Sequence, residues 1–125
     1  MPASTPPVEF EPVFTRLKAI LKKHARRLVV AADAPGNYLL NTQTLGPNKK
    51  PLMFGAVQLK KNYVSYHLFP VYMRPEFLAT LSPELRRRMQ GKACFNFKRE
   101  DKMLFAELAQ LTAACADWFA AEHSA

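Results

Sequence analysis

Polar side chains recur at every second residue in three stretches of this chain that have the pattern of β-strands. Because successive side chains of a strand point to opposite faces, these residues share one face of a sheet. They are Gln58 and Lys60, then Tyr63, Ser65 and His67, then Cys94, Asn96 and Lys98. Their ammonium groups, phenol, imidazole and amides suit an anionic or aromatic small molecule.

A ligand site is expected on this face, with extra positive charge at the ends of the strands. The predicted ligand-binding residues are Lys61, Tyr63, Ser65, His67, Lys92, Asn96 and Lys98. Lys61 and Lys92 are included because they flank the strands where an anion needs countercharge. An acidic protein partner, a homodimer interface and an ordinary solvated sheet face are the alternatives.

Catalysis and metal binding have weaker patterns. Cys94 and His67 share the polar face, and a neighbouring imidazole lowers a thiol pKa, but no third residue orients the pair. The three histidines, His24, His67 and His123, lack the spacing of metal ligands. We therefore expect a binding protein more than an enzyme, with no catalytic residue, no metal ligand and no cofactor assigned.

The charge balance points to anionic partners. The chain has 18 lysine and arginine residues against 10 aspartate and glutamate residues, a formal net charge of +8. Nucleic acid is one alternative, through a basic cluster near the third of these strands: Arg86, Arg87, Arg88, Lys92, Lys98, Arg99 and Lys102. No recognition motif accompanies the cluster, and the alternation buries Phe95 and Phe97, so nucleic acid is possible but not favoured.

Four strands are predicted to position these residues. Alternation and flanking turn residues indicate strands over 37–44, 53–60, 62–69 and 93–98. The second and third are so close that they must form a tight antiparallel hairpin. Val57, Leu59, Val64, Tyr66, Leu68, Phe95 and Phe97 then form the buried face.

Two long helices and two short ones complete the pattern. Apolar residues at three- and four-residue steps predict a helix over 8–30, which Asp33, Pro35 and Gly36 end. Proline marks two short helical turns, the second running over 83–90 with Ser82 as N-cap and Gly91 as the stop. A last helix begins after Glu100 and Asp101 and runs to about residue 121.

These elements predict an α+β fold with two layers. Each long helix has one apolar stripe, so both pack on one face of a small antiparallel sheet, with the short helices inserted before the last strand. At 125 residues the chain forms one domain over 8–121, between a disordered lead-in over 1–7 and a tail over 122–125. The opposite sheet face stays exposed or only partly covered by residues 71–90.

Two features of the sequence bear on where in the cell the protein is expected. No apolar run approaches the roughly 18 residues of a membrane span, so no membrane partner is expected. Cys94 and Cys115 do not make a disulfide framework, which favours a reducing, cytoplasmic location.

Several short segments resemble a known family. They are Phe54-Gly55-Ala56-Val57, Lys61-Asn62-Tyr63-Val64-Ser65, Phe69-Pro70-Val71-Tyr72, Met89-Gln90-Gly91-Lys92 and Cys94-Phe95-Asn96-Phe97-Lys98. In this order they are similar to the YdhG-like domain family, small bacterial proteins mostly of unknown function. The resemblance spans about residues 8–119 and implies a frataxin-like fold with two terminal helices on one face of an antiparallel sheet.

The resemblance also implies a second function. Some members of the wider group are described as frataxin-like iron chaperones, and frataxins hold iron on an acidic ridge along the first helix and first strand. Here Glu9 and Glu11 begin the first helix, and every later charge on it is positive. A frataxin-like metallochaperone is therefore the alternative to small-anion binding, and the resemblance supplies no established ligand.

Overall fold

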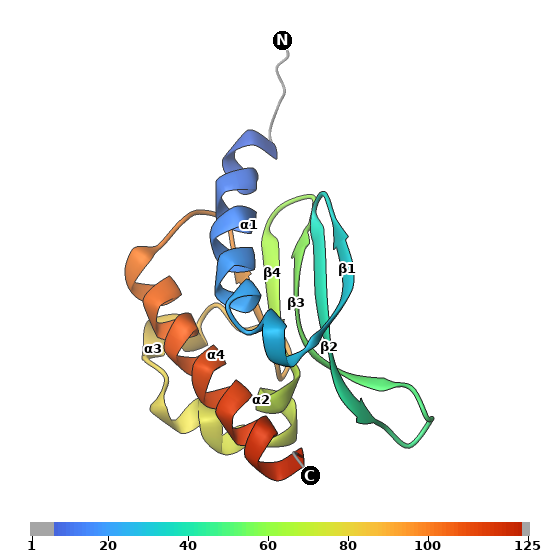
Figure 1. Ribbon diagram of the computed structural model, residues 1–125. Coiled ribbons are helices and arrows are strands. Elements are labelled where there is room, and N and C mark those ends of the chain that lie inside the picture. Colours follow the sequence, from blue (N-terminus) through green and yellow to red (C-terminus); the bar gives the residue numbers. More distant parts are fainter. Residues whose placement is uncertain (1–6, 124–125) are drawn as a thin grey trace.

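The computed structural model describes residues 7–123, which form one antiparallel sheet with helices on one side (Figure 1). In chain order the elements are α1 (Pro7–Lys22), the 3-10 helix η1 (Ala25–Arg27), β1 (Val29–Ala34), β2 (Asn37–Leu45), β3 (Pro51–Leu59), β4 (Val64–Leu68), α2 (Phe69–Met73), the 3-10 helix η2 (Pro75–Thr80), α3 (Pro83–Arg86), β5 (Cys94–Phe97) and α4 (Lys102–His123). Most of the predicted lead-in and the end of the predicted tail lie outside the described residues.

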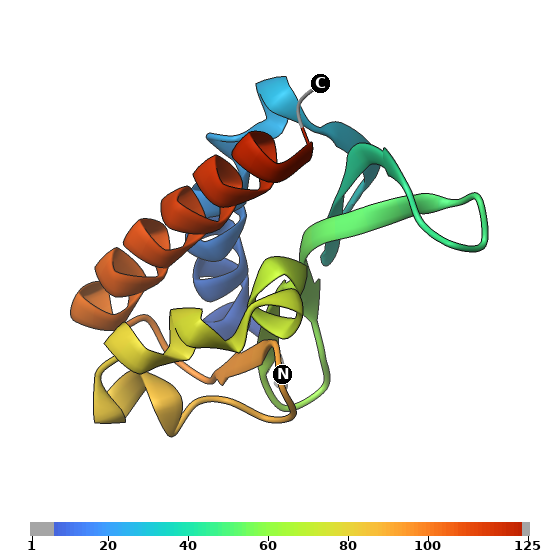
Figure 2. The ribbon, with the colours of Figure 1, turned by 90° about the horizontal axis from the view of Figure 1, so that it is seen from below.

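The sheet has five strands in the order β1-β2-β3-β4-β5, and each strand is antiparallel to the next. This confirms the α+β class and is compatible with the predicted two-layer sandwich. The hairpin of β2 and β3 is long, and its tip projects beyond the rest of the molecule in both views (Figures 1 and 2). Among the described residues, none of the helices combines the length and apolar character that crossing a bilayer requires.

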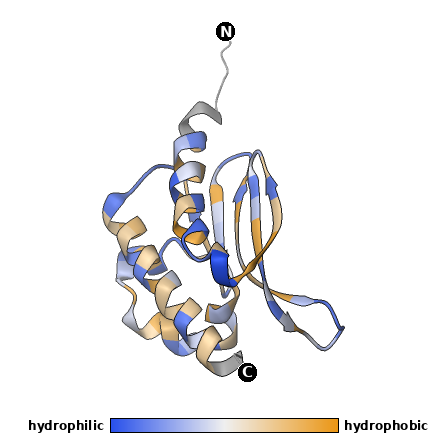
Figure 3. Ribbon diagram, viewed as in Figure 1, coloured by the Kyte–Doolittle hydropathy of each residue, from blue (hydrophilic) through white to orange (hydrophobic). Residues whose placement is uncertain are grey.

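The predicted alternation on β4 is confirmed. Val64, Tyr66 and Leu68 are buried on the inner face, where α1 packs on β3 and β4 and α4 meets β4 through the pair of Tyr66 and Thr112. Phe97 of β5 meets Phe105 of α4 edge-to-face, with ring centroids 5.0 Å apart. Hydrophilic segments lie away from this core, for example at the turn after α1 and at the tip of the β2–β3 hairpin (Figure 3).

A glycine lets α1 approach the sheet closely. A Cβ added at Gly55 of β3 would lie 2.9 Å from the Leu21 side chain of α1 and 2.9 Å from the carbonyl oxygen of His67. Real Cβ contacts are not that short, so any larger residue at this position pushes the helix or the strand away. Lys18 adds a polar tie, because its Nζ lies 2.8 Å from Asp33 Oδ1 at the end of β1.

The prediction of one helix over 8–30 is wrong at its C-terminal end. The helix ends at Lys22, and Val29 and Val30 belong to an additional edge strand, β1, that pairs with β2. Valine favours extended backbone, and strand pairing outweighs the helical spacing of Leu28. The turn at Pro35 and Gly36 therefore joins two strands and does not end a helix.

The prediction of a helix over 83–90 is also too long. Ser82 caps α3 as expected, since its Oγ accepts a hydrogen bond from the Leu85 N–H at 3.1 Å, but the helix ends at Arg86. The chain then runs along β5, where the Asn96 N–H donates to the Arg88 carbonyl at 2.8 Å. Gly91 has the expected positive φ of 82°, in the turn that leads into β5.

The short helices lie on the same side of the sheet as α4. Phe77 of η2 meets Trp118 of α4 edge-to-face at 5.9 Å, and the carboxylate of Glu107 accepts hydrogen bonds from the backbone and side chain of Ser82. Residues 71–90 therefore contact the sheet along the β5 edge and, through α2, at β3, and they leave its outer face open (Figure 1).

A buried pair of hydroxyl groups joins the sheet to α4. The Oη of Tyr66 lies 2.6 Å from Thr112 Oγ1, and Thr112 Oγ1 donates its own hydrogen to the Leu108 carbonyl at 2.7 Å. Because the threonine hydrogen is used, Tyr66 is the donor in the pair. Both side chains are fully buried, and burial raises the pKa of Tyr66 far above its ordinary value.

The donor direction predicts an asymmetric double-mutant cycle. Thr112→Val leaves the Tyr66 hydroxyl buried without an acceptor and should lower the free energy of unfolding by about 1–3 kcal/mol. Tyr66→Phe removes the donor and should cost about 0.5–1.5 kcal/mol. The double variant should be more stable than Thr112→Val alone, as measured by urea denaturation; simple addition of the two losses would contradict this geometry.

Candidate functional site

The outer face of the sheet has a polar half across β3, β4 and β5. Ser65 of β4 lies opposite Gln58 of β3 and Asn96 of β5, and His67 lies opposite Cys94. Lys60 follows β3 directly. We call these six residues the polar face: Gln58, Lys60, Ser65, His67, Cys94 and Asn96. The strand register therefore brings together the residues that the alternation predicted.

A chain of hydrogen bonds crosses the polar face. The Cys94 thiol donates to Asn96 Oδ1 at 3.4 Å, and Asn96 Nδ2 donates to Gln90 Oε1 at 2.8 Å. His67 Nε2 lies 3.7 Å from Cys94 Sγ. Since the single thiol hydrogen goes to Asn96, the contact from His67 is an Nε2–H donating to sulfur. This leaves Nδ1 as the acceptor nitrogen of the imidazole.

Within residues 7–123, the Ser65 side chain at the centre of this face has no hydrogen-bond partner. Its side chain is only 1% exposed, and its Oγ makes no hydrogen bond to any of the described residues. The amides on either side bond to other residues, since Asn96 donates to Gln90 and Gln58 Nε2 donates to Asn37 Oδ1 at 3.4 Å, and neither amide bonds to Ser65. A buried hydroxyl without a partner is costly and uncommon in proteins, so it requires an explanation.

Burial and one lysine set the protonation of the polar face. Burial lowers the pKa of His67, and the nearby Lys60 ammonium lowers it further. Burial raises the pKa of the Cys94 thiol, against the smaller opposing effects of Lys60 and of a backbone hydrogen bond from Tyr66. At neutral pH the imidazole and the thiol are therefore both uncharged, and Lys60 supplies the positive charge.

This protonation does not favour Cys94 as a nucleophile. Reactive cysteines have a lowered pKa, because the thiolate is the attacking species. Cys94 has a raised pKa, and Cys115 is fully buried with its pKa raised to about 12.

The predicted ligand residues are only partly gathered into one place. Ser65, His67 and Asn96 lie together on the polar face, and Tyr63 and Lys61 lie next to it in the turn between β3 and β4. Lys92 and Lys98 lie at opposite ends of β5, and both are exposed.

Lys92 contacts an aromatic ring outside the polar face. Its Nζ lies 5.8 Å from the ring centroid of Tyr72, which itself stacks on Phe69. Sequence reasoning missed the contribution of Gln90, because the predicted helix over 83–90 placed it away from β5. Asn37 begins a predicted strand, but only the register shows that it meets Gln58.

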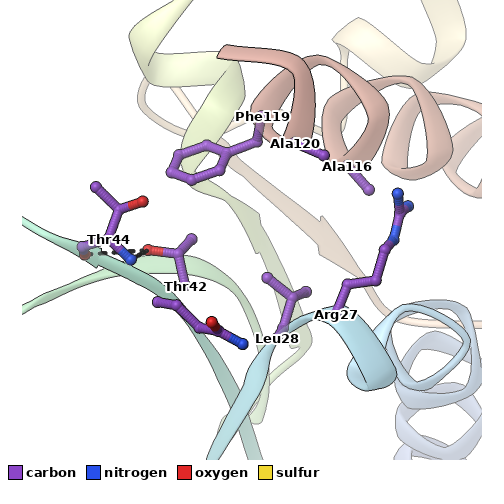
Figure 4. Close-up of a pocket in the computed structure, with 8 residues that line it drawn as sticks. Arg27, Leu28, Thr42, Thr44, Ala116, Phe119 and Ala120 are labelled. Carbon is purple, nitrogen blue, oxygen red and sulfur yellow. Dashed lines mark hydrogen bonds between the residues drawn. The ribbon is translucent and has the colours of Figure 1, made fainter. Parts of the chain in front are cut away.

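Two cavities lie on the helix side of the sheet, and no polar-face residue lines either of them. One, of about 260 Å³, lies between β2, η1 and the end of α4; Figure 4 shows Arg27, Leu28, Thr42, Thr44, Ala116, Phe119 and Ala120 around it. The other, of about 330 Å³, is a groove between α1 and α4 with Arg16 and Glu100, whose Nε and Oε2 atoms are 3.0 Å apart, at its edge. Sequence reasoning found neither, because each combines elements that are distant in the chain.

The part of the chain that the structure describes has few of the features expected of the two alternative functions, iron binding and nucleic-acid binding. Within 7–123, no three His, Cys, Asp or Glu side chains gather as a metal site would require. The basic cluster is exposed at Arg86, Arg87 and Arg88, but Phe95 and Phe97 beside it are buried and do not present a ring for base stacking.

Comparison with known proteins identifies no relative. No family model, no curated protein and no solved structure matches the chain. The resemblance to the YdhG-like family therefore stays a prediction that rests on its motifs.

The electrostatics of the polar face predict the effect of Lys60→Ala. Removing the ammonium should raise the pKa of His67 toward its ordinary value and raise the pKa of Cys94 further. NMR titration of the imidazole and the pH dependence of Cys94 alkylation measure these shifts. Lys50→Ala, in the distant β2–β3 hairpin, is the matched control and should change neither. Unchanged pKa values in Lys60→Ala would show that the ammonium does not act on this face.

Proposed function

We propose that this protein is a cytoplasmic, non-enzymatic binding domain that holds a small anionic ligand on the polar face. The observation that carries the proposal is the Ser65 hydroxyl, buried at the centre of the face with no partner among residues 7–123. A bound ligand explains why a hydroxyl is kept there at a cost to stability.

The donors and acceptors that remain define the ligand. Gln58 and Asn96 each use one amide N–H in the bonds to Asn37 and Gln90, and each has a second N–H. The Ser65 hydroxyl and the Lys60 ammonium are the further donors for a ligand. Both suit an anionic oxygen, such as that of a phosphate or carboxylate. His67, neutral at pH 7, offers Nδ1 as an acceptor for a hydroxyl or amine of the same ligand. A small phosphate or carboxylate that also carries a hydroxyl or amine fits this set.

Lysines around the face support an anion. Lys61 and Lys98 are exposed next to the turn and at the end of β5, where they add positive potential without a direct contact. We retain a frataxin-like, YdhG-like relationship as part of the proposal, supported by two long helices on one face of an antiparallel sheet. Iron binding and nucleic-acid binding are the rival functions.

The proposal predicts an opposite effect of Ser65→Ala on stability and on binding. Removing an unpaired buried hydroxyl should raise the free energy of unfolding by about 1 kcal/mol, because no hydrogen bond is lost. Affinity for the ligand should fall, since the donor is gone. Urea denaturation checks the first effect, and Thr112→Val, which removes a bonded hydroxyl, is the destabilising comparison. A loss of stability in Ser65→Ala would mean that the hydroxyl has a structural partner.

A thermal-shift screen tests the ligand class. Its probes are inorganic phosphate, a sugar phosphate, a nucleoside monophosphate and hydroxy acids, with ferrous iron in excess magnesium and a short oligonucleotide as rivals. A probe at 100 times its dissociation constant should stabilise the protein by about 2.7 kcal/mol. Stabilisation by iron alone, or by the oligonucleotide with a steep salt dependence, would replace the proposal with the corresponding rival.

Variants then locate the site of any anionic probe that binds. Lys60→Ala should weaken binding roughly tenfold to a hundredfold, because a charge-assisted hydrogen bond is lost. Lys98→Ala should have a smaller effect, and Lys50→Ala should have none. Equal affinity for all three variants would place the anion away from the polar face.

A further inference from the structure

We infer a second ligand site on the other side of the sheet, in the cavity of about 260 Å³ between β2, η1 and the C-terminal half of α4. The geometry points to a small free carboxylic acid with an apolar body, of the size of a six-carbon alkanoate or a benzoate. We call it the α4 cavity, and it is independent of the polar face.

Two alanines on α4 create the hollow. The inner stripe of α4 is built from large side chains, including Leu108, Leu111 and Phe119, which are buried. Ala116 and Ala120, one helical turn apart, interrupt it where the helix passes β2. Their methyl groups do not reach the sheet, so the space stays open between helix and strand.

The walls of the α4 cavity combine apolar and polar side chains: Leu28, Ala116, Phe119 and Ala120 are apolar, and Arg27, Thr42, Gln43 and Thr44 are polar. Phe119 extends from α4 toward Thr42 and Thr44 of β2, and Leu28 points toward α4 from the other side of the space (Figure 4). The Thr42 hydroxyl is satisfied within the β2–β3 hairpin, because it donates to the Leu52 carbonyl at 2.9 Å and accepts from the Thr44 N–H at 3.2 Å. Small-molecule sites combine apolar surface with polar groups that fix orientation, and this cavity provides both.

Arg27 supplies the polar group at the rim. Its guanidinium is half exposed, and its contact with Asp117 is a single 3.5 Å approach of Nη2 to a carboxylate oxygen that is itself well exposed. A strong arginine–carboxylate pair is bidentate and shorter, at about 2.7–2.9 Å. Arg27 can therefore bind a ligand carboxylate at the rim while the apolar part of the ligand fills the cavity.

The size of the α4 cavity limits the ligand. Its volume lies just below the roughly 300–1,000 Å³ of typical small-molecule sites. A short alkyl chain or one aromatic ring fits such a space, whereas a long acyl chain would extend past the rim into solvent. The charge of the rim selects a carboxylate over an alcohol or an amine with the same apolar part.

An NMR titration of the intact protein tests the inference, with hexanoate and benzoate as probes and hexanol and benzyl alcohol as neutral matches. Saturable shifts are expected at the amides of Leu28, Thr42 and Ala116, with each carboxylate binding about tenfold tighter than its alcohol. Ala120→Leu should fill the cavity and abolish binding. Ala114→Leu, on the exposed side of the same helix, should leave it unchanged.

A second pair of variants separates charge from shape. Arg27→Ala should reduce the affinity for hexanoate to that for hexanol, whereas Arg26→Ala, exposed and outside the lining, should not. If Ala120→Leu does not fold, Ala116→Leu serves the same purpose. Retained binding in the filled cavity, shifts confined to the polar face, or no saturable shift in the millimolar range would each overturn the inference. Ser65→Ala should not affect hexanoate, so this result is separable from that for the polar face.

Discussion

The phenol of Tyr66 extends from the middle of β4 through the apolar layer to Thr112 of α4, and the two hydroxyl groups lie 2.6 Å apart without solvent contact. This pair fixes the inner face of the strand under the helix, because a slip of one residue would bury a different set of side chains and break the hydrogen bond between Tyr66 and Thr112. With Tyr66 held inward, Ser65 and His67 must point outward. The composition of the outer face therefore follows from the packing of the inner one.

Both proposed sites lie where the helices do not cover the sheet. The outer face has no helix over it, so its polar side chains bond to one another and leave Ser65 as the group without a partner among the described residues. On the inner side, α1 packs on β3 and β4, and α4 contacts β4 and β5 through Tyr66 and Phe97. The α4 cavity lies farther along α4, where Ala116 and Ala120 are too small to reach β2. Positive charge borders both sites, at Lys60 and at Arg27.

Much of the fold could be predicted from local patterns. The strands over 37–44, 53–60, 62–69 and 93–98 correspond to β2–β5 within one or two residues, and Ser82 caps its helix as predicted. The errors share one cause. Leu28 fits the helical spacing of the residues before it, and residues 87–90 have a composition typical of a helix. In the structure, however, the residues that follow Leu28 pair with β2, and residues 88–90 form hydrogen bonds with β5. Pairing with a distant strand is a tertiary effect that local spacing does not contain.

The sequence by itself determined which residues share a face, because the period of two in a strand is a property of the backbone. It therefore predicted that Ser65, His67, Cys94 and Asn96 would lie on one surface. Only the tertiary structure decided which of them are bonded, that Ser65 is not, and that Lys92 turns away to Tyr72. It also decided where a cavity forms, because a cavity depends on the spacing of packed elements, here α4, η1 and β2, and no single segment of the chain encodes that spacing.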